Sequence, residues 1–363
     1  MKVLITYASA GAGHRRAAEA VYGYLKENRK DLNLVLVDIL PFINPLLRFC
    51  YNSGYPFLVH YAVWLWGFFF WLTEFKLTRW ISRKCSIVSN YLGCRKFVKY
   101  LINEEFDFII STHFLNSELA ANLKLKNKIR SKLITVVTDF GVHPFWVSNG
   151  TDLYIAGSGL TKEKLLEMGV AEQAIQVSGI PVSSSFTRVQ NKAELLVKFG
   201  MDADKFTVLL MTGSFGSGPL EKIAESLCND VQVLVVCAKN KKLFNRLKMR
   251  NFNNVKVFGF INNSEELMAI SDVIITKPGG LSIAELLNMR LLPIFISAIP
   301  GQEQKNVEIL ARYGVGCIGR NINQIKDLVV QLKNNPQKLQ SLKGSIAQAT
   351  KPSACQEIAN VIR

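Results

Sequence analysis

The sequence predicts an α/β protein made of two doubly wound domains, each with a parallel sheet covered by helices on both faces. Short, continuous apolar runs alternate with helical patterns along the 363-residue chain. Strands of this kind belong to sheets that are buried on both faces. A chain of this length also suits two domains better than one core. The alternation restarts near residue 205. This predicts domains 1–180 and 205–363 with a linker over 181–204, and the last helix is free to pack back on the first domain.

Ten runs rich in Val, Ile, Leu and Phe are the predicted strands. In the first domain they cover residues 2–8, 34–40, 106–111, 133–139 and 153–157. In the second domain they cover residues 206–211, 232–238, 255–260, 272–277 and 291–297. The segments between them are predicted to be helices and connecting loops.

Composition limits the class of protein. Apolar residues make up 49% of the chain and charged residues 20%, which predicts a folded globular protein. The seven cysteines form no CxxC pair, which favours a reducing compartment over a disulfide framework or a zinc site. Residues 1–20 lack the pattern of a signal peptide. We therefore expect a protein of the cytosol or of the cytoplasmic face of the cell membrane.

The chain has a net charge of +16, with basic runs over 76–99, 124–132 and 239–250. Such an excess indicates nucleic acid, anionic lipid or phosphorylated substrates as partners. For the third run, a solvated basic helix face is the simpler interpretation.

One aromatic segment, YPFLVHYAVWLWGFFFWLTEF over residues 55–75, interrupts the α/β alternation. It is barely long enough to span a bilayer, and a span would divide the first domain. Aromatic residues beside a basic run are typical of an interfacial segment. Helical spacing places Trp64, Phe68 and Trp71 on one face, and we expect them to contact a membrane. A buried core helix and a true span are the alternatives.

The first strand ends in the turn SAGAGH, in which Gly11 and Gly13 precede His14. A dinucleotide fingerprint would need a small residue where Arg16 stands, which argues against NAD or FAD. The positive end of a helix dipole disfavours an imidazolium, so His14 is expected to be neutral and able to accept a proton. The glycines would let a substrate approach. The alternative is a histidine that only caps the turn.

The second domain contains two glycine turns that each follow a strand. Gly213 and Gly216 lie in MTGSFGSG (211–218), and Gly279 and Gly280 open the helix of KPGGLSIAE (277–285). Backbone amides in such loops and at helix N-termini bind phosphate groups. Glu285 is placed to accept hydrogen bonds from a ribose diol.

The next helix begins with Gln302, Glu303 and Asn306 in PGQEQKN, polar groups that suit sugar hydroxyls or, alternatively, helix capping. No Asp/His cluster lies beside the phosphate loops, so no metal and no other cofactor is expected. The DAD run at 202–204 is interpreted as a solvated turn.

Taken together, SAGAGH, VTDFGVHPFW, GIPV, MTGSFGSG, GFINNSEELMAISDVIITKPGGLSIAE and PGQEQKN resemble the glycolipid-forming glycosyltransferases. These are the diacylglycerol glucosyltransferases and monogalactosyldiacylglycerol synthases, relatives of the peptidoglycan lipid-linked N-acetylglucosaminyltransferase. The resemblance implies a GT-B fold with the active site in the cleft between two Rossmann-like domains. It also implies inverting transfer of glucose or galactose from a UDP-sugar to a lipid, most simply diacylglycerol, by a peripheral membrane enzyme that binds an anionic membrane and no nucleic acid.

The resemblance also assigns residues. His14 is the expected catalytic base, with Gly11, Gly13, Asp139 and His143 on the acceptor side. Donor binding is expected from Gly213, Ser214, Gly216, Phe260, Ile261, Lys277, Gly279, Gly280, Leu281, Ser282, Glu285, Gln302, Glu303 and Asn306. Structural capping is the alternative role for Asp139 and His143.

Three other functions remain open on the sequence: the peptidoglycan-type N-acetylglucosaminyltransferase, a UDP-sugar 2-epimerase of the same fold, and a non-catalytic lipid- or nucleotide-binding protein. The last of these would not need His14.

Overall fold

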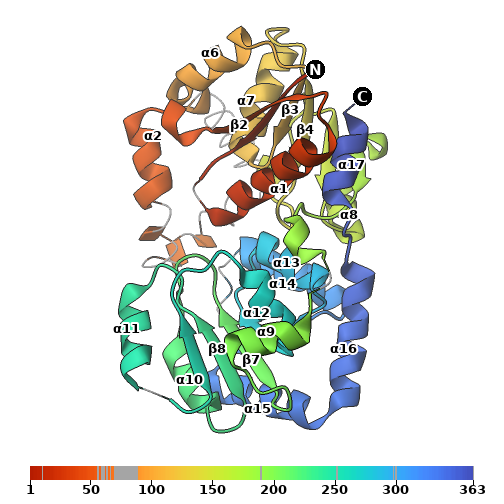
Figure 1. Ribbon diagram of the computed structural model, residues 1–363. Coiled ribbons are helices and arrows are strands. Elements are labelled where there is room, and N and C mark those ends of the chain that lie inside the picture. Colours follow the sequence, from red (N-terminus) through yellow and green to blue (C-terminus); the bar gives the residue numbers. More distant parts are fainter. Residues whose placement is uncertain are drawn as a thin grey trace. The chain divides into compact units, whose positions relative to one another are not determined.

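The computed structural model describes residues 1–9, 11–54, 57–58, 62, 64–65, 67–68, 89–188, 190–250, 252–296, 298 and 301–362. The chain divides into two compact units (Figure 1). The N-terminal unit comprises Met1–Ser184, Ile299–Asn306 and Lys351–Arg363, and the C-terminal unit comprises Ser185–Ala298 and Val307–Thr350. Residues 185–204, predicted as part of a linker, thus belong to the C-terminal unit.

A six-stranded parallel sheet forms the centre of the N-terminal unit, with strand order β2-β1-β3-β4-β5-β6. Its strands are β1 (Lys2–Tyr7), β2 (Asn33–Asp38), β3 (Phe108–Ser111), β4 (Lys132–Val136), β5 (Leu153–Ala156) and β6 (Ile175–Val177). Its helices are α1 (Ala12–Asn28), α2 (Pro45–Phe49), α6 (Arg95–Asn103), α7 (Phe114–Leu125), α8 (Gly159–Glu167) and α17 (Ala354–Val361). Shorter turns are the π-helix η2 (Cys50–Gly54) and the 3-10 helices η1 (Leu40–Phe42), η3 (Pro144–Trp146) and η4 (Glu172–Ala174).

The residues of β1 show why this sheet needs helices on both faces. Successive side chains of a strand point to opposite faces. Val3 and Ile5 are fully buried against α1 and α17, while Leu4 is buried against α6 and α7. The strand therefore has no face that tolerates water, as its continuous apolar sequence predicts.

The last helix packs on the N-terminal unit, where α17 lies beside α1 (Figure 1). The guanidinium of Arg29, just after α1, donates hydrogen bonds to the carbonyl oxygens of Ala359 at 3.1 Å and Ile362 at 2.7 Å. These two bonds satisfy carbonyls that the end of a helix would leave without partners.

The C-terminal unit has a second six-stranded parallel sheet, with order β12-β11-β10-β7-β8-β9. Its strands are β7 (Thr207–Met211), β8 (Gln232–Val236), β9 (Val255–Phe258), β10 (Val273–Thr276), β11 (Leu292–Phe295) and β12 (Cys317–Ile318). Its helices are α9 (Lys192–Phe199), α10 (Leu220–Leu227), α11 (Lys241–Arg250), α12 (Ser264–Ala269), α13 (Gly280–Asn288), α14 (Gln302–Arg312), α15 (Ile322–Asn334) and α16 (Pro336–Ala349). The 3-10 helix η5 (Ser184–Phe186) lies at the unit boundary, and the first turn of α14, up to Asn306, is counted with the N-terminal unit.

All ten predicted strands are present, and the prediction of two doubly wound parallel sheets is confirmed. Strands β6 and β12 were not predicted. They contain three and two residues and lie at sheet edges, so they carry too few apolar positions to give a pattern.

The aromatic segment 55–75 is described only in part. Its described aromatic residues are exposed: Phe57 by 58%, Trp64 by 74% and Phe68 by 50%. Trp71 lies outside the described residues. No helix among the described residues has both the length and the apolar character needed to cross a bilayer.

Candidate functional site

In the N-terminal unit, the chain leaves the neighbouring strands β1 and β3 in opposite directions along the sheet. Strand β1 lies between β2 and β3, so the loops that follow β1 and β3 diverge at the carboxyl ends of these strands. Ligands of open α/β sheets bind in such a crevice. The loop after β1 leads into His14 in the first turn of α1, and the residues after β3 are Thr112 and His113.

The His14 ring is fixed by its Nδ1 atom. Nδ1 lies 2.8 Å from the carbonyl oxygen of Thr112 and 2.9 Å from Oγ1 of Thr138. A carbonyl oxygen only accepts hydrogen bonds, so Nδ1 must carry the proton and donate it. In the neutral ring the lone pair then belongs to Nε2, the atom that can act as a base. The Thr112 hydroxyl donates in turn to the carbonyl oxygen of His14 at 2.8 Å, which ties the first turn of α1 to the end of β3.

The charge state of His14 follows from its surroundings. Burial lowers the pKa of His14 below its usual value, while the nearby carboxyl group of Asp139 and the hydrogen bond to Thr112 oppose that shift. The imidazole is therefore neutral near pH 7. The sequence led us to expect neutrality from the helix dipole, and in the structure burial lowers the pKa of His14 in the same direction.

Asp139 is held by residues that are distant in the sequence. The Gln302 side chain donates to Oδ2 of Asp139 at 2.8 Å, and the Asn306 amide lies 3.5 Å from Oδ1. Burial raises the pKa of Asp139, and His14 and the hydrogen bonds from Gln302, Asn306 and Trp146 partly offset it. The carboxyl group of Asp139 is thus held in place by Gln302 and Asn306, and from there it raises the pKa of His14.

Asn306 also makes two hydrogen bonds that the sequence did not predict. Asn306 is fully buried, and its Oδ1 accepts hydrogen bonds from the backbone amides of Phe140 and Gly141, both at 2.9 Å. Two of the three polar residues predicted to contact the sugar, Gln302 and Asn306, therefore also fasten the loop that carries Asp139. The donor-binding role of Glu303 stays a prediction.

The other predicted acceptor-side residues have simpler surroundings. The His143 imidazole accepts a hydrogen bond from the amide of Phe145 at 3.3 Å and so caps η3. A Cβ built on Gly11 would meet no described atom within 4 Å, so this glycine leaves open space before His14. Gly13 lies within the first turn of α1. Contact of these residues with an acceptor stays a prediction.

The C-terminal unit repeats this topology with different residues. Strand β7 lies between β8 and β10, so the loops after β7 and β10 diverge at the carboxyl ends. A side-chain bond joins the two loops: the Lys277 ammonium group, just after β10, donates to Oγ of Ser217 at 2.9 Å. The two glycine turns predicted to bind phosphate are therefore adjacent.

The glycines of these turns have two different roles, close packing at one position and open backbone at two others. A Cβ on Gly216 would lie 2.1 Å from the carbonyl oxygen of Cys237, so only glycine allows this loop to pack on the residues after β8. A Cβ on Gly213 or Gly279 would meet no described atom within 4 Å. These two positions leave backbone open to a ligand. Thr212, at the start of the first turn, has a buried hydroxyl to which no described group hydrogen-bonds.

Helix α13 begins directly after the second turn. Gly279 is its N-cap and offers no side chain, so the first amides, over 280–282, are not capped by one. Glu285, one and a half turns into α13, is buried. Phe260 and Ile261 follow β9, and because all strands are parallel they lie at the same sheet edge as both turns.

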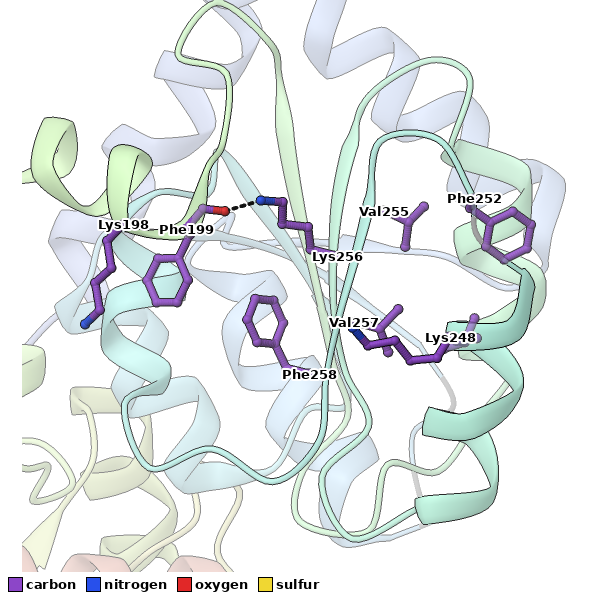
Figure 2. A pocket seen from close by; sticks show the side chains of 9 residues that line it. Lys198, Phe199, Lys248, Phe252, Val255, Lys256, Val257 and Phe258 are labelled. Atoms are coloured by element: carbon purple, nitrogen blue, oxygen red, sulfur yellow. Dashed lines mark hydrogen bonds between the residues drawn. The ribbon is translucent and has the colours of Figure 1, made fainter.

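A separate groove of about 460 Å³ follows the edge strand β9 (Figure 2). It is lined by Lys198, Phe199, Leu247, Lys248, Phe252 and residues 255–258. Figure 2 shows the rings of Phe199 and Phe258 close together, and they meet edge to face with centroids 5.9 Å apart. It also shows Lys256 donating to the carbonyl oxygen of Phe199. Lys198 pairs with Glu266 at 2.6 Å. Two of its lysines thus support the end of α9 and α12, and the groove lies apart from the glycine turns.

Three residues around His14 were not predicted: Thr112, Thr138 and His113. Each of them follows the end of a central strand, and this position in the sequence could have marked them as candidates. Across the described ranges, no three His, Cys, Asp or Glu side chains come close enough together to hold a metal ion.

Comparison with known proteins gives both halves of the chain a family. Residues 14–182 match the monogalactosyldiacylglycerol (MGDG) synthase family, and residues 207–361 match the glycosyltransferase family 28 C-terminal domain. The N-terminal half thus matches a glycolipid-synthase family and the C-terminal half a glycosyltransferase family, which makes the chain a glycosyltransferase. The resemblance seen in the sequence motifs is thereby confirmed for nearly the whole chain.

One curated relative is the processive diacylglycerol beta-glucosyltransferase of Staphylococcus epidermidis. It is 28% identical over 356 residues, which cover 96% of this chain and 88% of the relative. Among solved structures, MurG of Acinetobacter baumannii covers 99% of both chains with a TM-score of 0.58 at 14% identity. The UDP-GlcNAc 2-epimerase of Neisseria meningitidis, bound to UDP-GlcNAc, covers 100% of this chain and 99% of its own with a TM-score of 0.62 at 14% identity. At such identities these two structures support the fold alone.

Proposed function

We propose that this glycosyltransferase moves a hexose from a UDP-sugar to a diacylglycerol-type lipid, with inversion at the anomeric carbon, to make a membrane glycolipid. The observation that carries the proposal is the His14 site. A neutral imidazole, with Nδ1 bound to a backbone carbonyl and Nε2 left as a base, lies in the half of the chain that matches the MGDG synthase family.

The proton step follows from this geometry. The hydroxyl oxygen of the acceptor attacks the anomeric carbon and its proton passes to Nε2 of His14. The positive charge that then develops on the imidazole is stabilised by the Thr112 carbonyl and by the carboxyl group of Asp139. The bond from the anomeric carbon to the diphosphate breaks, and UDP leaves with the electron pair.

UDP binding is assigned to the glycine turns of the C-terminal unit. The uncapped amides at 280–282 and the loop over 213–216 would stabilise the negative charge that grows on the departing diphosphate. Glu285 would accept hydrogen bonds from the ribose. No metal enters this scheme.

Incubation of the protein with diacylglycerol and one UDP-sugar at a time, read by mass spectrometry of the lipids, tests the proposal. UDP-glucose, UDP-galactose and UDP-GlcNAc form the donor panel. We expect hexosyl-diacylglycerol from UDP-glucose or UDP-galactose, and UDP release that depends on the lipid. Transfer from UDP-GlcNAc alone would favour the peptidoglycan-type alternative. Conversion of UDP-GlcNAc at C2 without lipid would favour a 2-epimerase.

We further propose that the N-terminal unit docks on an anionic membrane on the cytoplasmic side through its exposed apolar residues. Besides Phe57, Trp64 and Phe68, the helix α2 exposes Leu46 by 75% and Phe49 by 64%. Exposed aromatic residues gain free energy at the bilayer interface, and neighbouring basic residues are attracted to anionic headgroups. A lipid acceptor needs such a contact to leave the bilayer.

Cosedimentation with acidic phospholipid vesicles tests the docking. Replacing Trp64 and Phe68 with serine should release the protein from vesicles and reduce activity on long-chain lipid, with UDP binding retained. Leu125→Ser, which removes an apolar side chain exposed by 59% on the same unit, is the matched control. Equal vesicle binding by the double variant and the wild type would contradict the docking proposal. So would the joint loss of UDP binding and folding, since the segment would then be core.

A further inference from the structure

A second histidine, His113, contacts the catalytic histidine. The His14 and His113 rings meet edge to face, with centroids 4.6 Å apart and planes at 79°. His113 is buried between β3 and α7, where the ring of Phe114 stacks on it at 4.3 Å. The proton transfer described above does not use it.

The hydrogen bonds of the two rings put the proton on different nitrogen atoms. The Nδ1 atom of His113 accepts a hydrogen bond from the backbone amide of Leu115 at 3.2 Å, so it carries no proton. Burial and the neighbouring His14 lower the pKa of His113 well below its usual value, so the ring is neutral. A neutral ring with a bare Nδ1 has its proton on Nε2. His14 thus offers Nε2 as an acceptor and His113 offers Nε2–H as a donor.

The Nε2–H donor of His113 has no hydrogen-bond acceptor among the described residues. His113 is only 3% exposed, but Nε2 is not among the fully buried side-chain atoms that lack a partner, so this atom keeps some contact with solvent. A donor that is nearly buried and still reachable can be satisfied by water or by a ligand atom. An unused donor in contact with the catalytic base therefore points to a substrate atom as its partner.

The surroundings of His113 indicate which substrate this is. The ring of Tyr51 lies 6.1 Å from that of His113, and Tyr51 belongs to η2, which immediately precedes the aromatic segment 55–75 in the sequence. One ring beside His113 is thus contributed by the short segment between α2 and the aromatic segment, both of which are proposed to contact lipid.

We propose that His113 is an acceptor-binding residue whose Nε2–H donates a hydrogen bond to a lipid oxygen next to the attacking hydroxyl. In a 1,2-diacylglycerol the carbon beside the one bearing the hydroxyl carries an ester, so the two oxygens are neighbours. A donor aimed at the attacking oxygen would weaken it as a nucleophile, whereas a donor to the neighbouring ester oxygen orients the hydroxyl toward His14. This inference rests on the proposed function.

Two variants separate this role from the capping of α7. His113→Asn keeps a strong N-cap acceptor in place of Nδ1 but loses the Nε2–H donor. His113→Gln keeps an amide donor near the position of Nε2 but loses the cap.

Steady-state transfer to diacylglycerol should show kcat/KM for the lipid reduced by ~2–10-fold in His113→Asn, the value of about one neutral hydrogen bond, mostly through KM. His113→Gln should keep most of the activity. UDP affinity and the acid limb of the pH–rate profile should be unchanged in both.

A matched acceptor sharpens the test. In a diacylglycerol analogue with a methylene group in place of the ester next to the hydroxyl-bearing carbon, the penalty of His113→Asn should disappear. An unchanged KM in His113→Asn, a penalty that persists with the analogue, or equal losses in both variants would overturn the inference while leaving the proposed function intact. Absence of any lipid transfer by the wild-type protein would instead overturn the proposed function itself.

Discussion

The two units place different chemistry at the same point of the same topology. In the N-terminal unit, the loops after β1 and β3 bring together side chains: two histidines, two threonines and a buried carboxyl group. In the C-terminal unit, the loops after β7 and β10 present glycine backbone, open at Gly213 and Gly279. The side chains at the first point are suited to proton transfer, and the open backbone at the second is suited to binding an anion. A doubly wound sheet thus fixes where a ligand binds, and the loop residues decide what is done to it.

Removal of the base should have the largest effect. His14→Ala should lower turnover by ~10²–10⁴-fold, the usual cost of losing a general base. The measurement is steady-state transfer with saturating UDP-sugar and lipid. Turnover within a few-fold of the wild type would show that another group takes the proton.

The corresponding substitution in the C-terminal unit, Glu285→Ala, should change the affinity for UDP. Glu285→Ala should weaken UDP binding by ~1.5–3 kcal/mol, the range for a hydrogen bond to a charged group. Isothermal titration with UDP measures it, and Glu308→Ala, at an exposed position of α14, is a control that removes a carboxylate elsewhere. Unchanged affinity would make Glu285 a structural carboxylate of α13.

A smaller effect is expected from the carboxyl group that faces His14. Asp139 raises the pKa of His14 against the effect of burial, so Asp139→Asn should lower that pKa further. Because the base is active when neutral, the acid limb of the pH–rate profile should move to lower pH. The plateau rate should fall by roughly fivefold or less, since a weaker base is a poorer catalyst. A shift of the limb to higher pH would contradict the electrostatic role.

The smallest effect should come from chelation. Excess EDTA should leave transfer unchanged, because helix and loop amides are proposed to stabilise the leaving diphosphate. Loss of activity that magnesium or manganese restores would refute this part of the scheme.

The sequence predicted most of the fold because long apolar strands and glycine turns leave local patterns. It also singled out His14 as a candidate base, since a histidine after Gly-x-Gly at a strand end is a local signal, and that role stays a prediction. It did not predict the links from Gln302 and Asn306 to the Asp139 loop, which join residues more than 160 positions apart. Nor did it single out His113, whose meaning depends on its contact with His14 and on which nitrogen of each ring is already bound. Such features exist only once the strands are paired.

The central claim is that the N-terminal unit supplies the base and the C-terminal unit binds the nucleotide. The most direct test measures UDP affinity and turnover in the same preparations of His14→Ala and Glu285→Ala. We expect His14→Ala to lose turnover while its affinity for UDP stays within about twofold of the wild type, and Glu285→Ala to lose affinity. A His14→Ala protein that loses UDP affinity together with turnover would contradict this division of roles.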